Sequence, residues 1–104
     1  MPGRYPISLD LSQKICLVVG GGPVAERKVK SLLECGALVR VVSPEITPGL
    51  ENLADEGRID CRRRQFRPPD LEGVFLVIGS TNQETVNRQV AEEGVARNLL
   101  VNIV

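Results

Sequence analysis

The sequence contains no histidine and no tryptophan, and only one tyrosine and two phenylalanines stand among its 104 residues. Histidine is the commonest metal ligand and the commonest acid–base group near neutral pH, so its absence disfavours sites built on either role. Proteins that bind single-stranded nucleic acid usually stack the bases on aromatic side chains. The scarcity of aromatic residues therefore argues against nucleic acid as a partner.

Net charge and long apolar runs are also missing. The 13 lysines and arginines balance 13 aspartates and glutamates, so no overall charge attracts the chain to nucleic acid or to an anionic membrane. No apolar run approaches the ~20 residues that a membrane span needs. The opening residues, Met1–Pro6, lack the apolar segment of a secretory signal. We expect a cytoplasmic protein with no membrane contact.

The cysteines are few and scattered. Cys16, Cys35 and Cys61 are odd in number and widely spaced, and no pair resembles a metal knuckle or a redox-active CxxC. Iron binding by Cys35 and Cys61 requires a fold that brings them together, and nothing in their placement suggests it. We predict three reduced thiols, with Cys16 in the core, and no metal site.

Hydrophobic patterning predicts alternating strands and helices in a single domain over residues 1–104. Continuous apolar runs that end in turn residues are typical of central parallel strands, which are buried on both faces. The alternation of Ile7, Leu9 and Leu11 suggests a short strand or an extended lead-in with one buried face. The main predicted strands cover residues 15–19, 38–42, 59–66, 74–78 and 99–104.

The segments between these strands carry helix signals. Pro23 suits a first helical position and Gly36 a helix end, and Glu26 is expected to point to water. Thr47–Pro48 is typical of a cap and first turn, and Asn82 can cap the last helix. Such alternation predicts an α/β fold of the Rossmann type. We expect a doubly wound, mostly parallel five-stranded sheet with helices on both faces.

A glycine-rich turn follows the first predicted strand. Gly20, Gly22 and Ala25 fit the G-x-G-x-x-G/A fingerprint of dinucleotide-binding domains. The first glycine permits a tight turn, the second lets the pyrophosphate approach the backbone, and the small third residue allows close helix packing. No G-K-[ST] follows, which excludes a P-loop. We predict that the pyrophosphate of a dinucleotide binds at Gly20–Ala25, although a turn with no ligand is the alternative.

The end of the second predicted strand bears on the choice between NAD and NADP. Many NAD-binding domains have an acidic residue there that binds the ribose hydroxyls, whereas this chain has Ser43. Glu45 is close enough in sequence to take that role, or it is a solvated loop carboxylate. No lysine or arginine follows before Arg58, so a 2′-phosphate lacks an obvious partner. The sequence favours NAD.

Several segments resemble one known family. Val18–Lys28 is similar to the VGGGxVAxRK signature of the siroheme synthase amino-terminal domain, a family of precorrin-2 dehydrogenases and sirohydrochlorin ferrochelatases. Pro6–Leu11, Val41–Glu45, Ser80–Asn82 and Val101–Val104 also resemble family segments. The resemblance covers nearly the whole chain. It implies a domain that binds NAD in an enzyme of sirohaem biosynthesis.

The resemblance also implies roles for individual residues. It assigns one group to the pyrophosphate, one to the adenosine ribose and one to the nicotinamide. The pyrophosphate group is Gly20, Gly21, Gly22, Pro23 and Val24. The ribose group is Ser43, Pro44 and Glu45, and the nicotinamide group is Ser80, Thr81 and Asn82. Ala25 completes the predicted cofactor-binding set.

The family's catalytic aspartate directly follows the segment that matches Val101–Val104, so we expect no catalytic residue within residues 1–104. The resemblance implies that the full enzyme is a homodimer that oxidises precorrin-2 with NAD⁺ and possesses, in many members, ferrochelatase activity toward sirohydrochlorin and ferrous iron. We expect these 104 residues to be the amino-terminal part of such an enzyme, monomeric and inactive alone.

Three questions stay open at this level. The basic cluster of Arg62, Arg63 and Arg64 fits protection of an edge strand, attraction of an anionic tetrapyrrole or, less well, nucleic-acid binding. Asn102 is either a positioning residue for the reaction or a polar strand end. The alternative to an enzyme is a non-catalytic regulatory domain that senses NAD(H), although such domains tend to keep an acid where this chain has Ser43.

Overall fold

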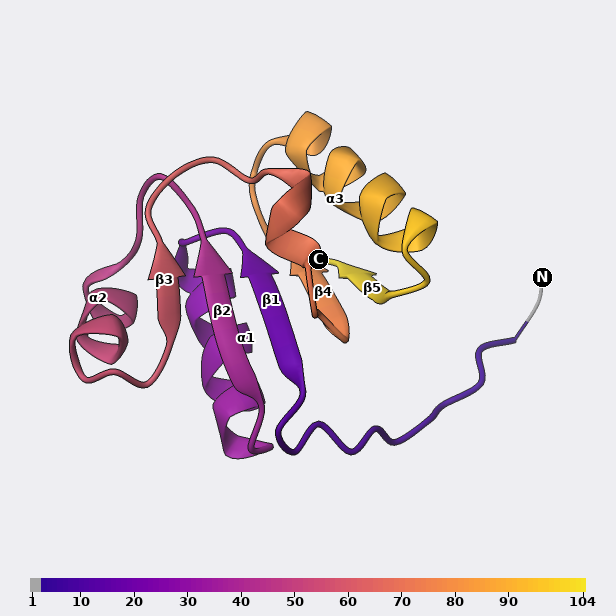
Figure 1. Cartoon of the computed structure of the whole chain (residues 1–104), viewed down its shortest axis with the longest axis horizontal. Helices are drawn as coiled ribbons and strands as arrows, with labels where there is room; N and C mark the ends of the chain where they lie inside the picture. The colour runs from indigo at the N-terminus through magenta and orange to yellow at the C-terminus, as the bar shows by residue number, and fades with distance from the viewer. Residues whose placement is uncertain (1–2) are drawn as a thin grey trace.

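A computed structural model describes residues 3–104, which form one five-stranded sheet in the order β3-β2-β1-β4-β5 (Figure 1). Every strand pairing in this sheet is parallel. The strands are β1 (Ile15–Val19), β2 (Leu38–Val42), β3 (Asp60–Arg62), β4 (Leu76–Gly79) and β5 (Leu100–Ile103). The helices are α1 (Pro23–Glu34), α2 (Pro48–Asp55), the 3-10 helix η1 (Pro68–Leu71) and α3 (Glu84–Ala96).

The order of the strands creates a reversal in the middle of the sheet. The chain moves outward from β1 to β2 and β3, then returns to place β4 on the other side of β1 and continues to β5. Val18 lies beside Val41 on one flank and beside Ile78 on the other. In open parallel sheets, ligands bind beyond the carboxyl ends of the strands at such a reversal. The predicted doubly wound fold is confirmed.

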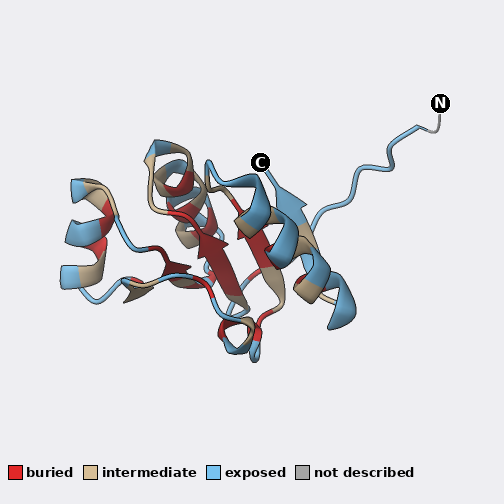
Figure 2. Ribbon diagram, turned by 90° about the horizontal axis from the view of Figure 1, so that it is seen from above, coloured by how far each residue is buried: buried red, intermediate tan, exposed pale blue. Residues whose placement is uncertain are grey.

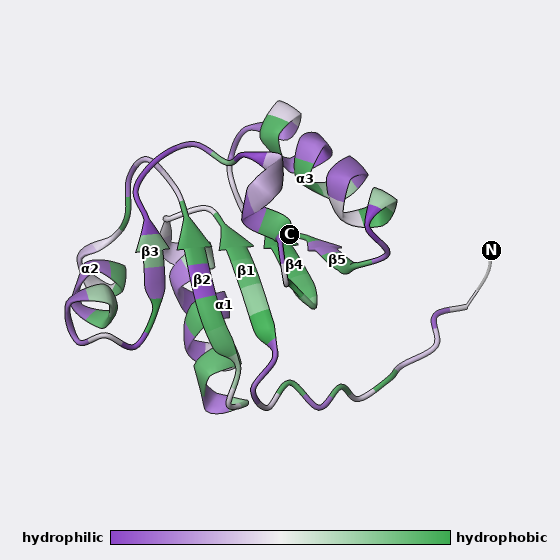
Figure 3. Cartoon of the chain, in the orientation of Figure 1, coloured by the Kyte–Doolittle hydropathy of each residue, from purple (hydrophilic) through white to green (hydrophobic). Residues whose placement is uncertain are grey.

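Two hydrophobic layers hold the sheet between its helices. Val18 packs on one face with Val29 of α1 and Leu50 of α2. Leu17 packs on the opposite face with Val90 of α3. Each fully buried aliphatic side chain contributes about 1.5–3 kcal/mol of transfer free energy, so the central strands carry much of the stability. Figure 2 shows the buried residues concentrated in these strands, and Figure 3 shows the same strands as the most hydrophobic part of the chain.

Local signals place most helix ends correctly. Pro23 is the first residue of α1, and Thr47 caps α2 by accepting a hydrogen bond from the Leu50 amide at 3.1 Å. The predicted cap at Asn82 is wrong, because α3 begins at Glu84 with Gln83 at its N-cap position. Thr81 organises this loop instead, since its hydroxyl accepts a hydrogen bond from the Gln83 amide at 3.1 Å.

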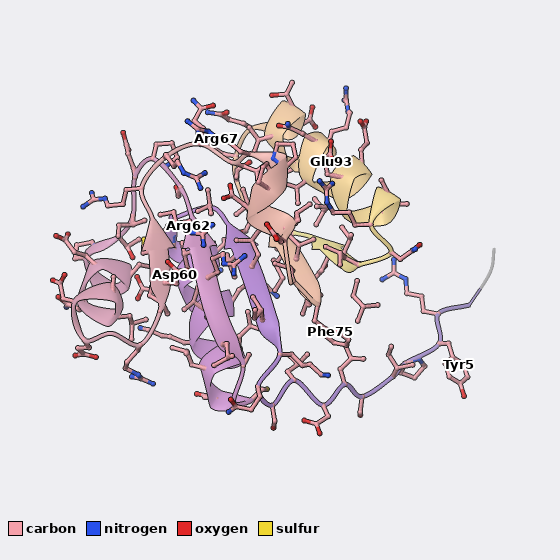
Figure 4. All side chains as sticks on the ribbon, viewed as in Figure 1. Tyr5, Asp60, Arg62, Arg67, Phe75 and Glu93 are labelled. Atoms are coloured by element: carbon pink, nitrogen blue, oxygen red, sulfur yellow. The ribbon has the colours of Figure 1, made fainter. Side chains whose placement is uncertain are left out.

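Two segments depart from the predicted pattern. The third strand covers only Asp60–Arg62, because the chain then leaves the sheet edge and turns toward η1. The amino-terminal lead-in forms no strand within residues 3–11, and its predicted buried face is wrong for Ile7 and Leu9, which are 66% and 42% exposed. Leu11 alone of the three apolar residues reaches the core. Tyr5 lies on the extended part of this segment, away from the sheet (Figure 4).

Candidate functional site

A cleft of about 910 Å³ opens at the carboxyl edge of the sheet, where β1, β2 and β4 end. It lies at the reversal of strand order described above. All predicted cofactor-binding residues except Ala25 line it: Gly20, Gly21, Gly22, Pro23, Val24, Ser43, Pro44, Glu45, Ser80, Thr81 and Asn82. Sequence reasoning missed further lining residues, among them Ile46, Thr47, Gln65, Phe66, Gln83, Val86 and Val104.

The fold itself requires the first glycine of the turn. Gly20 has a φ of +137°, a backbone conformation that residues with a side chain rarely adopt. A Cβ at this position would also lie 2.8 Å from both the carbonyl oxygen and the hydroxyl oxygen of Ser80. Gly20 therefore serves the tight turn and the close approach of the loop that follows β4.

Gly22, the last glycine of the turn, has no such structural reason to be a glycine. Gly22 has an ordinary φ of −87°, and a Cβ built on it meets no heavy atom within 4 Å. Neither strain nor crowding within the described residues explains why a side chain is absent here. Because Gly22 lines the cleft, the space above it is available to a ligand that approaches the backbone.

Unpaired amides surround this space at the start of α1. The backbone N–H groups of Gly21, Gly22, Val24 and Ala25 make no hydrogen bond to any residue within 3–104. Gly22 occupies the N-cap position and has no side chain to satisfy them. The helix dipole adds partial positive charge at this end. Together these groups are suited to a phosphate or pyrophosphate.

Ala25 does not line the cleft. Its side chain is 0% exposed and packs in the core with Val18 and Val29. Its side chain therefore has the packing role that the fingerprint predicts, and only its backbone N–H at the start of α1 remains a predicted contact to the cofactor. A methyl group fits between the helix and the sheet, which is the role of the small third residue in the fingerprint.

The loop from Ser43 to Thr47 forms a second wall of the cleft. Ser43 is buried, and its hydroxyl donates to the Glu45 carbonyl at 2.7 Å, so it supports the loop from within. The Thr47 hydroxyl donates to Oε1 of Glu26 at 2.5 Å. This hydrogen bond, with a second from Lys30, holds the pKa of Glu26 below its ordinary value. The prediction that Glu26 simply points to water is wrong.

Glu45 is exposed and is the one ionisable side chain among the described residues that line the cleft. No lysine or arginine belongs to that set. The cleft therefore offers a carboxylate to hydroxyl groups, while a second phosphate on the ribose would meet no cation from residues 3–104. Carboxylates accept hydrogen bonds from sugar hydroxyls and repel phosphates.

The third wall is the loop between β4 and α3, which a single side chain holds. Asn87 of α3 donates from Nδ2 to the Thr81 carbonyl at 3.0 Å. Its Oδ1 accepts from the Thr81 amide at 3.2 Å and from the Thr81 hydroxyl at 2.8 Å. The Asn87 amide thus satisfies both backbone groups of Thr81. Val104 continues this wall, because its amide donates to Gly79 at 2.9 Å and its side chain lines the cleft.

The basic cluster is held by a buried acid that sequence reasoning missed. Strand β3 is at the sheet edge, as the edge-protection hypothesis assumed, but Arg62 and Arg64 both form ion pairs with Asp70 of η1. Arg62 also pairs with Asp60, and these two labelled residues lie together on β3 in Figure 4. Arg63 stays exposed. Two of the three arginines are therefore engaged within the fold.

Other candidate residues lie outside the cleft. Asn102 pairs with Ile78 in the sheet, is exposed and does not line the cleft. Cys16 is buried in the core, as predicted, and burial raises the pKa of its thiol. Within residues 3–104, no group of three or more His, Cys, Asp or Glu side chains is placed to hold a metal. The helices of this part of the chain include none long and apolar enough to cross a membrane.

The parallel doubly wound sheet, the cleft at its reversal point and the glycine turn at the start of α1 define a dinucleotide-binding domain of the Rossmann type. Residues 7–104 match the model of the family NAD_binding_7, described as "Putative NAD(P)-binding", and the chain belongs to that family. The expectation of a nicotinamide dinucleotide as cofactor is confirmed at this level.

Relatives of known name support the family resemblance. The siroheme synthase of Methylobacillus flagellatus is 48% identical over 99 residues, which are 95% of this chain and 21% of that protein. The siroheme synthase of Chromobacterium violaceum is 43% identical over 100 residues, 96% of this chain and 21% of that protein. The chain therefore spans about a fifth of the length of these relatives.

A solved structure has the same fold. "SirC, precorrin-2 dehydrogenase" matches with a TM-score of 0.86 and 33% sequence identity, and the match covers 95% of this chain and 48% of that one. The resemblance to the siroheme synthase amino-terminal domain, first inferred from short motifs, is confirmed over nearly the whole chain.

Proposed function

We propose that this chain is the NAD-binding domain of a precorrin-2 dehydrogenase, which oxidises precorrin-2 to sirohydrochlorin with NAD⁺. The observation that carries the proposal is the open space above Gly22, bounded by the unpaired amides at the start of α1. The residues fit a pyrophosphate there. Neither backbone conformation nor crowding requires glycine at position 22, so a ligand that approaches the backbone explains the missing side chain. The likeness to SirC, precorrin-2 dehydrogenase, supports the choice of reaction.

In this proposal the three walls of the cleft bind the three parts of the cofactor. The turn Gly20–Val24 holds the pyrophosphate, the loop Ser43–Glu45 flanks the adenosine ribose, and Ser80–Asn82 lie beside the nicotinamide. The placement of the three loops around one cleft supports this assignment. Bound NAD⁺ supplies the hydride acceptor of the reaction. The chain's own residues hold and orient it, and Glu45 accepts hydrogen bonds from the ribose hydroxyls.

The same cleft favours NAD over NADP. The 2′-phosphate of NADP would lie near the Glu45 carboxylate, and no lysine or arginine among the described lining residues is available to neutralise it. Like charges in proximity raise the cost of binding.

A regulatory domain that senses NAD(H) is the second candidate, but no contact within residues 3–104 favours it over the enzyme.

The tetrapyrrole site and the proton-transfer group belong, in this proposal, to a longer enzyme. The described residues beside Ser80–Asn82 supply hydroxyls and amides but no acid or base. Val104 lines the cleft next to this loop, so a residue that follows it in the chain would stand at the nicotinamide end. This supports an aspartate at that position as the catalytic group. Iron insertion into sirohydrochlorin is proposed for the same complete enzyme, as is the homodimer.

Residues 1–104 alone should then bind NAD⁺ but oxidise precorrin-2 at a rate near background. Loss of a positioned acid–base group typically costs about 10²–10⁴-fold in rate. The assay follows NADH formation with precorrin-2 for this chain and for a chain extended past Val104 by the aspartate and the segments that enclose the substrate. Equal rates would show that the aspartate is not the catalytic group.

Binding itself is tested with Gly22→Asp. Aspartate is a favourable N-cap residue, because its carboxylate accepts hydrogen bonds from free amides of the first turn. In this variant the carboxylate takes the amides that the pyrophosphate needs and repels its charge. We expect the melting temperature to be unchanged or higher, and NAD⁺ binding to be lost in calorimetry.

The matched control is Gly3→Asp, which adds the same charge at an exposed glycine outside the cleft. It should bind NAD⁺ as the wild type does. Wild-type protein that binds neither NAD⁺ nor NADP⁺, or a Gly22→Asp variant that keeps its affinity, would refute the proposed function.

A further inference from the structure

The middle glycine of the turn has a reason that the nucleotide fingerprint does not supply. The fingerprint leaves the position between Gly20 and Gly22 free. A Cβ on Gly21 would lie 2.0 Å from the carbonyl oxygen of Glu45 and 2.8 Å from the hydroxyl oxygen of Ser43. Real Cβ atoms do not approach backbone oxygen that closely. Gly21 is therefore required by the Ser43–Thr47 loop, whatever ligand the turn binds.

Two hydrogen bonds from Thr47 tie the same loop to the turn and to α1, and a third joins the turn to the end of β2. The Thr47 amide donates to the Gly21 carbonyl at 2.9 Å, and the Gly20 amide donates to the Val42 carbonyl at 3.0 Å. The Thr47 hydroxyl donates to the Glu26 carboxylate at 2.5 Å. That carboxylate stands one helical turn beyond the glycines, in the first turn of α1.

The first turn of α2 packs closely against the same Glu26 carboxylate. A Cβ on Gly49, in the first turn of α2, would lie 2.5 Å from Oε2 of Glu26. The Thr47 hydroxyl also accepts from the Leu50 amide, so one side chain caps α2 and binds α1 at once. The starts of the two helices are thus joined through Glu26 and Thr47. We call this set of contacts, made by Gly21, Glu26 and Thr47, the clasp.

We propose that the clasp sets the specificity of the cofactor site by fixing the Ser43–Thr47 loop, and with it Glu45, at one distance from the pyrophosphate turn. The inference rests on the proposed function, in which this loop flanks the adenosine ribose. Gly21 and Thr47 are then positioning residues, because they determine where Glu45 lies relative to the adenosine ribose. Thr47 does so through Glu26, and Gly21 does so in addition to its place in the pyrophosphate turn.

The physical consequence is a difference between NAD and NADP. With the clasp closed, Glu45 is held where it accepts from ribose hydroxyls and repels a 2′-phosphate. With the clasp open, the loop is free to move, so the hydroxyl contacts weaken and the repulsion is relieved. A net hydrogen bond of this kind corresponds to about a twofold to tenfold change in affinity. The ratio of NAD to NADP affinity should fall accordingly.

The experiment measures that ratio in the 104-residue chain by calorimetric titration with NAD⁺ and NADP⁺. Thr47→Val removes the hydroxyl bond to Glu26, and Gly21→Ala forces the loop away without changing any side chain of the loop. We expect each variant to lower the ratio of NAD⁺ affinity to NADP⁺ affinity by about fivefold. Thr47→Ser keeps the hydroxyl and should restore the wild-type ratio.

Thr85→Val and Gly3→Ala are the matched controls, since both positions are exposed and outside the cleft. They should leave the ratio unchanged. Melting temperatures are recorded in parallel, because a purely structural clasp would lower them without changing the ratio. That result, in a wild type that binds NAD⁺, would overturn this inference alone. A wild type that binds neither nucleotide would instead refute the proposed function.

Discussion

Arg64 donates to both carboxylate oxygens of Asp70, with Nη2 2.6 Å from Oδ1 and Nη1 2.9 Å from Oδ2. Asp70 is 1% exposed, and it also accepts from the Arg67 amide and from Arg62. These bonds close the loop that carries Phe66 against the core and into the wall of the cleft. An acid six residues away thus determines where the arginine cluster lies.

Asp70→Asn should lower the free energy of unfolding by about 2–3 kcal/mol. Breaking a buried ion pair costs about 3–5 kcal/mol, and the partial exposure of the arginines reduces that figure. Urea denaturation of both proteins measures the difference. Asp55→Asn is the control, because Asp55 is exposed at the end of α2. A loss no larger than that of the control would contradict a structural role for the pair.

Asp70 should also make stability depend on acid pH. Burial alone raises the pKa of this carboxyl, but the hydrogen bonds from Arg64, Arg67 and Arg62 outweigh burial, and the pKa is lowered. A lowered pKa means that the stabilisation is complete above the unfolded-state value of about 3.9 and is lost as the pH falls below it. The urea midpoint of Asp70→Asn should therefore fall less steeply below pH 4 than that of the wild type. If the urea midpoints of the two proteins fall equally steeply below pH 4, Asp70 is not the source of the acid sensitivity.

Asn87→Ala tests the assignment of the β4–α3 loop to the nicotinamide. Removing the side-chain amide releases both backbone groups of Thr81. We expect NAD⁺ affinity to fall by about fivefold, while ADP-ribose, which has no nicotinamide, binds as before. Calorimetry with the two ligands gives the comparison. Gln89→Ala, at an exposed position of α3, is the control, and an equal loss for both ligands would count against the assignment.

Glu45→Arg should shift the preference of the cleft toward NADP. The substitution replaces a carboxylate with a guanidinium, which binds phosphate through charge-assisted hydrogen bonds. We expect NADP⁺ affinity to rise by about tenfold or more while NAD⁺ affinity falls. Glu56→Arg makes the same charge change at an exposed position away from the cleft. If both variants gain the same NADP⁺ affinity, net charge rather than the position of Glu45 is responsible.

The isolated chain should sediment as a monomer at micromolar concentration. Leu100 and Ile103 expose apolar surface on the edge strand β5, and Val104 adds to it. A stable protein–protein interface buries about 800 Å² on each partner, and a few side chains on one short strand provide less. Analytical ultracentrifugation measures the mass directly. A tight dimer would place an interface on the Rossmann domain itself.

Much of the fold and part of the site follow from sequence alone. The apolar runs of β1 and β4 identify central strands, because burial on both faces excludes polar residues. The Gly20 turn and the Thr47 cap are determined by the chemistry of a few neighbouring residues, so they are visible locally. The spacing of the small residues in the fingerprint likewise predicts that Gly22 lies beside the phosphate.

Tertiary structure decided which distant groups meet. Nothing near Glu26 in the sequence indicates that Thr47 binds it, and nothing near Asp70 indicates that it is buried beneath two arginines. The reason for Gly21 lies in a loop more than 20 residues away. Local patterns encode turns and buried faces within a few residues, whereas these contacts depend on strand order and register, which the whole chain sets together.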